Sequence, residues 1–239
     1  MTFQNLSEQL FHELGRQIVH GKIKPGEYLP KVEVLSEMKG VSRTVVREVL
    51  KGLDARRLIK SYTKVGTVVQ PRSKWQWWDP DVLAWASEAE DNQAFLLQLT
   101  EVRLAIEPAA VELAAQNATA DDIQEIKKRY EQLKQAFGDE AKWVKADSEF
   151  HNSILAASHN ELILSLVHTL RKALEKSRHT TIHVIKQHSF SQSNGAYEEV
   201  VVRHKKIMEA VCRGDGPAAR IKMKELLERV SQLILNIDK

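Results

Sequence analysis

The sequence of 239 residues contains a single cysteine, Cys212, so no disulfide can form within one chain. A chain without disulfides is expected in a reducing compartment, and we therefore expect the cytoplasm. No apolar run approaches the roughly 20 residues that a membrane-spanning helix needs, so no membrane contact is expected. The first residues, MTFQNLSEQLFHEL, lack a basic region followed by an apolar core, and no secretory signal is expected.

Charge is distributed unevenly along the chain. Hydrophobic residues make up 43% and charged residues 28%, as in globular proteins, and the length suits two domains of ordinary size. Residues 1–74 carry 14 basic and 7 acidic side chains, whereas the remainder carries 21 and 25, so the net charge of +3 combines a basic and an acidic part. This asymmetry indicates that only the first part contacts a polyanion.

Residues 41–60, VSRTVVREVLKGLDARRLIK, predict a helix with two contrasting faces. Ser42 is a good N-cap, because its oxygen can accept a hydrogen bond from an amide of the first turn. The residues expected to form a buried stripe at helical spacing are Val45, Val46, Val49, Leu50 and Leu53. The opposite face carries Arg43, Thr44, Arg47 and Lys51. Such a face suits the major groove of DNA, where arginine reads guanine edges and hydroxyl and ammonium groups hold phosphates. The alternative is an ordinary solvated helix face.

The segments before this helix complete a helix-turn-helix. A first helix is predicted over residues 6–20, and a second over residues 31–39, with Val34, Leu35 and Met38 facing inward. The sequence MKGVS forms the turn, with Gly40 where a left-handed residue costs little.

A short β-hairpin is predicted after the recognition helix. Residues 58–62 and 66–70 are β-prone and flank a three-residue connection, which is typical of the wing of a winged helix. Lys64 at the tip can reach a phosphate or the minor groove, and Gly66 lets backbone approach backbone closely.

The stretch PRSKWQWWDP separates a DNA-binding domain, residues 1–72, from a helical domain, residues 80–239, with residues 73–79 as a tryptophan-rich linker. We expect Trp75, Trp77 and Trp78 to pack at an interface between domains or subunits. Base stacking is the alternative, but no single-strand-binding fold surrounds these rings. Beyond the linker the pattern predicts an all-α antiparallel bundle, so the fold class is mainly α. Helices are expected near residues 80–89, 92–117, 119–137, 139–158, 160–180, 195–213 and 216–237.

Four polar residues fall on the inward faces of three of these helices. Asp147 and His151 are spaced i, i+4 and share a face with Trp143, Phe150 and Ile154. His204 lies within the stripe of Val200, Ile207 and Val211, and Arg103 lies beside Leu99, Ile106 and Ala110. Burying such groups unpaired costs several kcal/mol, so they must satisfy one another or a guest molecule.

Two chemistries fit these residues. Asp147, His151 and His204 supply a carboxylate and two imidazoles, which are ordinary ligands for zinc, nickel or manganese. The alternative is a core hydrogen-bond network joining Asp147 to His204 or to Arg103. The guanidinium of Arg103 suits a carboxylate effector bidentately, and the alternative for this residue is a surface pair with Glu107.

The whole order of elements resembles the GntR family of bacterial transcription factors. The segment VSRTVVREVLKGLDARRLI is similar to the family's VSRTPVREALxxLxxEGLV, and GEYLP and GTVV match its G-x-x-LP and GTFV. EVRLAIEPAAVELAA, DSEFH and RHKKIMEAVCRGD resemble the E-x-R, D-x-x-FH and EHxxIxxAIxxGD motifs of the FadR-like subgroup, which has an FCD ligand domain. WWDPDVLAWA looks most like galactonate-operon repressors and other sugar-acid regulators of that subgroup.

The resemblance also has implications for the site and shows where this chain departs from the family. Asp147, His151 and His204 match three of the four FCD metal positions, but Leu226 stands where the fourth, usually a histidine, is expected. The protein therefore either supplies three ligands at most or binds no metal. In the DNA-binding part, the family often has arginine at the position of Glu33 and glycine at the position of Lys64, so a different operator sequence is expected.

Together these features predict a homodimeric, DNA-binding transcriptional regulator and not an enzyme. By resemblance, it is a repressor that binds double-stranded operator DNA and responds to a small carboxylate. One alternative is a metal-dependent hydrolase or lyase fused to a basic module, but no positioned nucleophile or general base accompanies the three candidate ligands. Another is a helical interaction protein without a small ligand, which the inward charged residues argue against.

Overall fold

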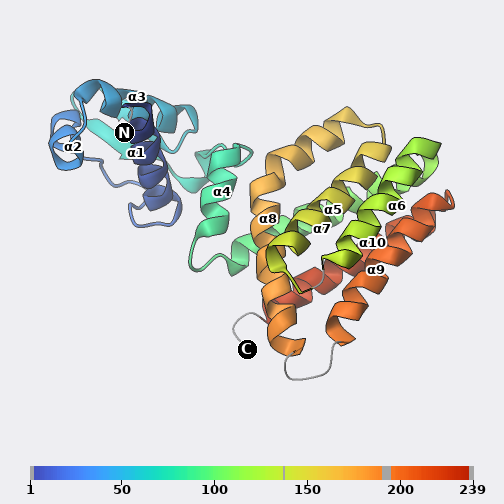
Figure 1. The fold of residues 1–239 in the computed structure, drawn as a ribbon. Helices are drawn as coiled ribbons and strands as arrows, with labels where there is room; N and C mark the ends of the chain where they lie inside the picture. Colours follow the sequence, from blue (N-terminus) through green and yellow to red (C-terminus); the bar gives the residue numbers. More distant parts are fainter. Residues whose placement is uncertain (1–2, 137, 190–194, 237–239) are drawn as a thin grey trace. The chain divides into compact units, whose positions relative to one another are not determined.

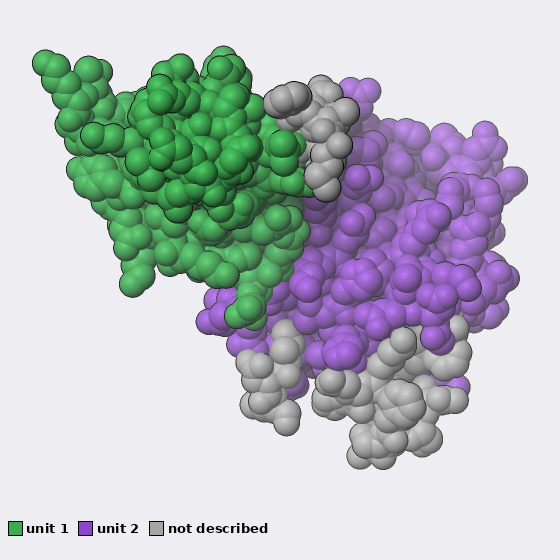
Figure 2. All heavy atoms as spheres, turned by 60° about the vertical axis from the view of Figure 1, so that its left-hand side comes forward, with its two compact units in different colours: residues 1–90 green, residues 91–239 purple. Residues whose placement is uncertain are grey.

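The computed structural model describes residues 3–136, 138–189 and 195–236. The chain divides into two compact units, an N-terminal unit, Met1–Glu90, and a C-terminal unit, Asp91–Lys239 (Figures 1 and 2). Both are mainly helical, and the strands of the described residues form one two-stranded sheet in the N-terminal unit. No helix among the described residues has the length and apolar character needed to cross a membrane.

The N-terminal unit is a winged helix-turn-helix followed by one further helix. Its elements are α1 (Phe3–Val19), α2 (Val32–Lys39), α3 (Arg43–Ala55), β1 (Ile59–Tyr62), β2 (Gly66–Val69), the 3-10 turn η1 (Arg72–Lys74) and α4 (Pro80–Glu88). The predicted hairpin is confirmed, because β1 and β2 pair antiparallel with Ile59 opposite Val69. An isolated bridge between Tyr28 and Val68 attaches the connection after α1 to the same sheet.

Helix α3 begins and packs as its sequence predicts. Ser42 is its N-cap and accepts a hydrogen bond from the amide of Val45, while Gly40 ends α2 with a positive φ of 63°. Val46, Val49, Leu50 and Leu53 are buried, whereas Val45 is only half-buried because it lies at the edge of the stripe. In α2 the prediction is wrong for two residues, since Leu35 is buried but Val34 and Met38 are 44% and 66% exposed. An eight-residue helix presents only about two turns, and one leucine suffices to attach it.

Helix α4 packs on α1 through Trp85. The indole N–H of Trp85 donates to Nδ1 of His12 (3.1 Å), and Nε2 of His20 donates to the carbonyl of Trp85 (2.8 Å). A β-carbon at Gly15 would lie 2.4 Å from the Trp85 ring, so the indole fits only because α1 has glycine there. Arg16 adds an ion pair with Glu88 (2.7 Å). These contacts explain why α4 belongs to the N-terminal unit, whereas the sequence predicts a second domain that begins at residue 80.

The tryptophan-rich segment also packs locally. Trp75 is 5% exposed, and its indole N–H donates to the carbonyl of Gln70 (2.8 Å). The guanidinium of Arg72 lies over both Trp75 and Trp77, at 4.8 and 5.0 Å from the ring centroids. Trp78, by contrast, is 54% exposed. The expectation that all three rings pack at an interface therefore needs correction for Trp75, which is buried within its own unit.

The C-terminal unit is a bundle of six helices in the described residues. They are α5 (Gln93–Asn117), α6 (Ala120–Gln135), α7 (Glu140–Ala157), α8 (Glu161–Ser189), α9 (Gly195–Cys212) and α10 (Gly216–Leu235). Helix α10 packs along α5 and α9, and α7 packs against α6, α8 and α5 (Figure 1). Helix α8 extends beyond the predicted end at residue 180, because Ile182, Val184 and Ile185 bury their side chains and no helix breaker intervenes.

The close approach of Trp85 to Gly15 gives a test of the α1–α4 packing. We expect Gly15→Ala to lower the free energy of unfolding of the full chain by about 1–3 kcal/mol, because the added methyl group overpacks the indole. Alanine in an open helix position would instead stabilise by roughly 1 kcal/mol. Urea unfolding followed by tryptophan fluorescence measures the difference.

Gly52 in α3 is the matched control. A β-carbon at Gly52 would lie 3.1 Å from the Phe11 ring, a milder contact than that at Gly15. Gly52→Ala should therefore change stability less than Gly15→Ala. A larger loss in Gly52→Ala would contradict the assigned packing of Trp85.

Candidate functional site

The first candidate site is the exposed face of α3. Arg43, Thr44, Arg47 and Lys51 are all exposed, and the apolar residues of the same helix face the core of the N-terminal unit. Ser42 is exposed at the start of the helix, where its side chain acts as the N-cap. Helix α3 thus presents guanidinium, hydroxyl and ammonium groups to solvent on a rigid element, as the sequence predicts.

The hairpin adds a second basic projection. Lys64 is exposed in the connection between β1 and β2 and has a positive φ of 64°, a conformation that glycine adopts more easily. Gly66 has φ 120°, and a β-carbon there would come within 3.5 Å of the Tyr28 ring. The close approach expected at Gly66 is therefore to a side chain from the connection before α2.

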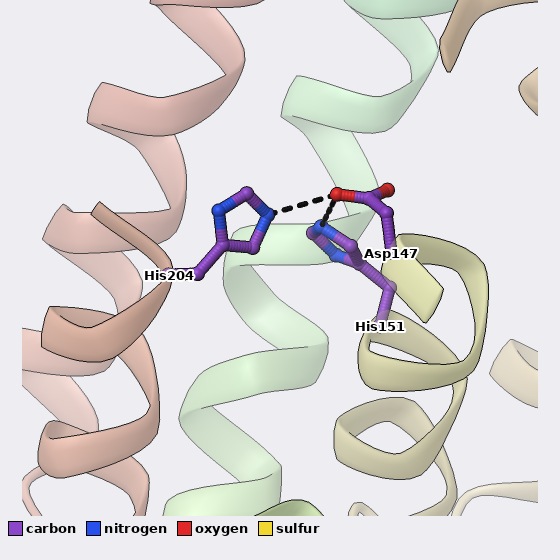
Figure 3. Close-up of side chains that lie close together, drawn as sticks. All are labelled: Asp147, His151 and His204. Carbon is purple, nitrogen blue, oxygen red and sulfur yellow. Dashed lines mark ion pairs between the residues drawn. The ribbon is translucent and has the colours of Figure 1, made fainter. Parts of the chain in front are cut away.

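The second candidate site lies inside the C-terminal unit, where α7 and α9 bring Asp147, His151 and His204 together (Figure 3). One ligand atom from each residue lies within 4.8 Å of the others, and the three residues are 7%, 3% and 2% exposed. Oδ1 of Asp147 is 3.0 Å from Nε2 of His204 and 3.9 Å from Nε2 of His151. The predicted inward orientation of these three side chains is confirmed.

Both imidazoles turn the same nitrogen toward Asp147. Nδ1 of His204 donates to the carbonyl of Val200 (2.7 Å), since a carbonyl can only accept. In the neutral ring, Nε2 then carries a lone pair that faces the carboxylate. Nδ1 of His151 lies 3.7 Å from Oε2 of Glu107, while its Nε2 faces Asp147. Nδ1 aimed at an oxygen and Nε2 left for a cation is the usual arrangement of metal-binding histidines.

The buried nitrogens are not satisfied by the protein. Nδ1 of His151 and Nε2 of His204 have no hydrogen-bond partner among the described residues. Nε2 of His204 lies 3.0 Å from Oδ1 of Asp147 but without the alignment of a hydrogen bond. A divalent cation held by Asp147 and the two histidines would give Nε2 of His204 a partner, while Nδ1 of His151 faces Oε2 of Glu107 at 3.7 Å, so the donor set fits a metal.

Burial and neighbouring charge set the protonation of this site. Burial lowers the pKa of His151 to about 3, so its ring is neutral at physiological pH. Burial alone would raise the pKa of Asp147, but His151 and the Arg178 guanidinium favour the ionised carboxylate and hold that pKa well below its usual value. The site therefore presents one carboxylate and a neutral imidazole, the forms that bind metal.

Arg103 is buried with Glu107, in contrast to the surface pair considered from the sequence. Nε and Nη2 of Arg103 donate to the two carboxylate oxygens of Glu107 at 2.7 and 3.4 Å, and both residues are less than 5% exposed. Burial alone would raise the pKa of Glu107, but the positive charge of Arg103 more than offsets this and lowers it. Arg103 thus lies near the candidate site, and its contact with Glu107 uses only the Nε–Nη2 side of the guanidinium.

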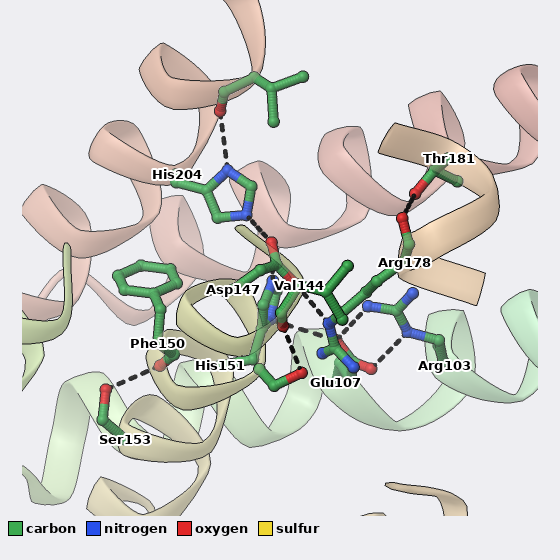
Figure 4. A network of polar contacts seen from close by, with 12 residues as sticks. Arg103, Glu107, Val144, Asp147, Phe150, His151, Ser153, Arg178, Thr181 and His204 are labelled. Atoms are coloured by element: carbon green, nitrogen blue, oxygen red, sulfur yellow. Dashed lines mark hydrogen bonds and ion pairs between the residues drawn. The ribbon is translucent and has the colours of Figure 1, made fainter. Parts of the chain in front are cut away.

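Arg178 of α8 is a member of the site that the sequence analysis missed. Its Nε donates to Oδ2 of Asp147, the oxygen that does not face the histidines (Figure 4). The predicted partners of Asp147 were His204 and Arg103, and only His204 contacts it directly. Arg178 and Ser177 are both buried in the middle of α8. The sequence around Arg178, EKSRHTT, is polar and gives no signal of burial.

A cavity of about 50 Å³ opens beside these groups. Its lining includes Arg103, Asp147, His151, Arg178 and His204. Leu226 of α10 lines the same cavity and is 5% exposed, so the residue at the fourth family metal position does face the site. The cavity thus joins the candidate metal ligands to two buried guanidinium groups, which suits a small anion.

Comparison with protein families gives two matches that together cover most of the chain. Residues 6–69 match the family described as "Bacterial regulatory proteins, gntR family", and residues 98–229 match the FCD domain. The first match covers the helix-turn-helix and the hairpin, and the second covers most of α5 to α10.

Curated relatives match along nearly the whole length. The chain is 30% identical to the galactonate operon transcriptional repressor of Escherichia coli (strain K12), over 90% of each chain. It is also 30% identical to the Uxu operon transcriptional regulator of the same strain, over 97% of this chain and 90% of the relative. Among solved structures, the Listeria monocytogenes protein Lar gives a TM-score of 0.61 at 18% identity, over 96% of each chain, which supports the fold.

The buried pair in α5 gives a stability test. We expect Glu107→Gln to lower the free energy of unfolding by about 3–5 kcal/mol, because it leaves the charge of Arg103 buried without a counter-charge. Chemical denaturation of the full chain measures the loss.

Glu112 in the same helix provides the control. It pairs with Arg220 at 2.8 Å, and their side chains are 27% and 58% exposed. Glu112→Gln should cost less than about 1 kcal/mol, as exposed pairs do. Equal losses in the two variants would show that burial of the Arg103 pair has been misassigned.

Proposed function

Because the chain belongs to the GntR family of bacterial regulatory proteins and carries an FCD domain, we propose that it is a transcriptional repressor whose operator affinity is controlled by a small carboxylate. The relatives are DNA-binding regulators, so the hydrolase or lyase considered from the sequence is not supported. The observation that carries the proposal is the buried cluster of Asp147, His151 and His204 beside two guanidinium groups in one cavity.

A sugar acid is the effector class that we propose. The cavity combines a candidate cation site with guanidinium groups, which together favour a carboxylate that bears neighbouring hydroxyl groups. Relatives named for the galactonate, Uxu and Exu systems make the same class the first to test.

Asp147, His151 and His204 would hold a divalent metal, with zinc, nickel and manganese as candidates. When bound, the metal supplies an electrophilic centre that an effector carboxylate can coordinate. Leu226 offers no fourth donor, so the remaining coordination positions are left to effector or water. Arg103 borders the same space and completes the proposed effector-binding set.

For DNA, we propose that α3 enters the major groove and that the hairpin contacts the adjacent backbone. Arg43 and Arg47 would read bases, Thr44 and the N-terminal end at Ser42 would hold phosphate, and Lys64 beside Gly66 would reach the backbone or minor groove. One winged helix makes few base contacts, so a homodimer on a near-palindromic operator is expected. Such a regulator acts in the bacterial cytoplasm.

The linkage between effector and DNA follows from thermodynamics. An effector lowers operator affinity only if it binds the DNA-free state more tightly, and the coupling is then reciprocal. DNA should therefore weaken effector binding by the same factor by which the effector weakens DNA binding.

The recognition helix can be tested directly. Arg43→Ala and Arg47→Ala should each weaken binding to the cognate operator by about 1–3 kcal/mol, because each loses a base contact. Fluorescence anisotropy at fixed salt measures this. Glu48→Ala, an exposed neighbour on α3 with no proposed contact, is the control. Wild-type operator affinity in both arginine variants would show that α3 does not contact the bases.

The metal proposal is tested by His151→Ala. This variant should lose zinc and the response to sugar acids, because it removes one of three ligands, while operator affinity stays within about tenfold of wild type, since α3 belongs to a separate unit. Elemental analysis, a thermal-shift screen of sugar acids with and without chelator, and operator-release assays give the three readouts.

Leu226→His is the complementary variant. It restores a fourth donor at the cavity wall and should raise zinc affinity, since four-ligand sites hold zinc more tightly. If His151→Ala retains both its metal and its full effector response, the effector site lies elsewhere.

A further inference from the structure

The two faces of the hairpin sheet differ in character. Successive residues of a strand point to opposite faces, and Ile59 and Val69, which pair across β1 and β2, are both buried toward the core of the N-terminal unit. Lys60 and Tyr62 alternate with Ile59 along β1 and are exposed, Tyr62 to 49%. The outward face of the hairpin therefore presents an ammonium group and a phenol to solvent.

A second tyrosine joins this face from outside the hairpin. The segment before α2 runs antiparallel beside β2, where the amide of Leu29 donates to the carbonyl of Thr67 (2.8 Å) and Tyr28 bridges to Val68. Val68 in turn lies opposite Lys60 of β1. Residues directly opposite each other share a face of the sheet, so Tyr28 lies on the outward face with Lys60, and it is 60% exposed.

Gly66 lies between the two tyrosines. It pairs with Tyr62 across the hairpin, and a β-carbon at Gly66 would lie 3.5 Å from the Tyr28 ring. The two phenols thus approach Gly66 from the strands on either side of β2, next to the exposed Lys64 of the hairpin connection. Apolar residues exposed singly need no explanation, but two phenols beside one glycine form a common surface. We call Tyr28, Lys60 and Tyr62 the tyrosine face.

The chemistry of the tyrosine face favours DNA over a protein partner. Residues 58–70 contain two lysines and no acidic residue, and lysine is depleted at protein interfaces. Nζ of Lys60 lies 3.8 Å from Oδ1 of Asp54, but the two side chains are 55% and 40% exposed, so this pair leaves the ammonium open to a phosphate. Tyrosine hydroxyls are among the neutral groups that donate to phosphate oxygens in protein–DNA complexes.

We propose that the tyrosine face is a further contact of the N-terminal unit with operator DNA. The hydroxyl groups of Tyr28 and Tyr62 donate to phosphate oxygens, and Lys60 neutralises a phosphate beside them. This inference rests on the operator binding proposed above and adds a sheet face to the contacts of α3 and the hairpin connection. Phosphate contacts position a protein on the duplex without reading sequence, so the tyrosine face sets affinity while α3 reads the bases.

The test uses the full-length protein with two duplexes, one that the wild type selects from random DNA and a scrambled duplex of equal length. Tyr28→Phe and Tyr62→Phe each remove one hydroxyl and keep the ring. Each should weaken binding to both duplexes by about tenfold, as expected for the loss of a hydrogen bond to a charged group. The slope of affinity against salt should stay unchanged, because a neutral donor releases no counterion. Fluorescence anisotropy over a series of salt concentrations measures both quantities.

Two further variants are the matched controls. Lys60→Ala should also weaken both duplexes, but it should reduce the salt slope by about one, because it removes a charge that neutralises a phosphate. Tyr130→Phe makes the same chemical change at a buried position of α6 in the C-terminal unit, and it should leave both affinities as in wild type.

The outcomes separate this inference from the proposed function. Wild-type affinity in either Tyr28→Phe or Tyr62→Phe, or a loss confined to the selected duplex, overturns the contact assigned to that tyrosine and leaves operator binding by α3 standing. A change in dimer assembly by analytical ultracentrifugation, with duplex affinity unchanged, assigns the face to a protein partner and also overturns the inference. Failure of the wild type to enrich any duplex overturns the proposed function as well.

Discussion

Two ion pairs buried among three helices constrain the C-terminal unit. Arg103 and Glu107 come from α5, Asp147 from α7 and Arg178 from α8, and each charge is neutralised by one neighbour. An isolated buried ion costs several kcal/mol, so α7 and α8 are held in the register that brings Asp147 and Arg178 together. Apolar contacts such as those of the buried Trp143 and Phe150 have no preferred direction, whereas each ion pair requires a fixed geometry. The register of α7 and α8 and the arrangement of the candidate site thus depend on the same charged groups.

The same pairs leave the two histidines as the unsatisfied part of the cluster. Asp147 gives one oxygen to Arg178 and turns the other toward both Nε2 atoms, while the Nδ1 atoms face Val200 and Glu107. This division orients the imidazoles before any ligand arrives. A cation would bind a preorganised set of donors without an ordering cost, which is the usual advantage of a rigid site.

Much of the fold could be predicted from the sequence because the elements have strong local signals. The stripe of α3, its N-cap Ser42 and the turn at Gly40 are local features, and the structure contains each of them. The shared orientation of Asp147 and His151 could also be predicted, since i, i+4 spacing places them on one face. The pairing of Arg178 with Asp147 could not be predicted, because it joins residues 31 positions apart on different helices. The exposure of Met38 has a similar cause, since periodicity alone cannot show that α2 contacts its neighbours through so little surface.

The packing of Trp85 against Gly15 affects where such a regulator can be divided to make a chimaera. The indole packs against α1 at Gly15, and Trp85 forms hydrogen bonds with His12 and His20 of that helix region. Helix α4 therefore completes the core of the unit that carries α3 and the hairpin. A chimaera that joins this DNA-binding unit to a different ligand-binding domain should therefore have its junction near Glu90, after α4. A junction at Pro71 would remove Trp85 and leave the apolar groove beside Gly15 exposed on the transferred DNA-binding unit.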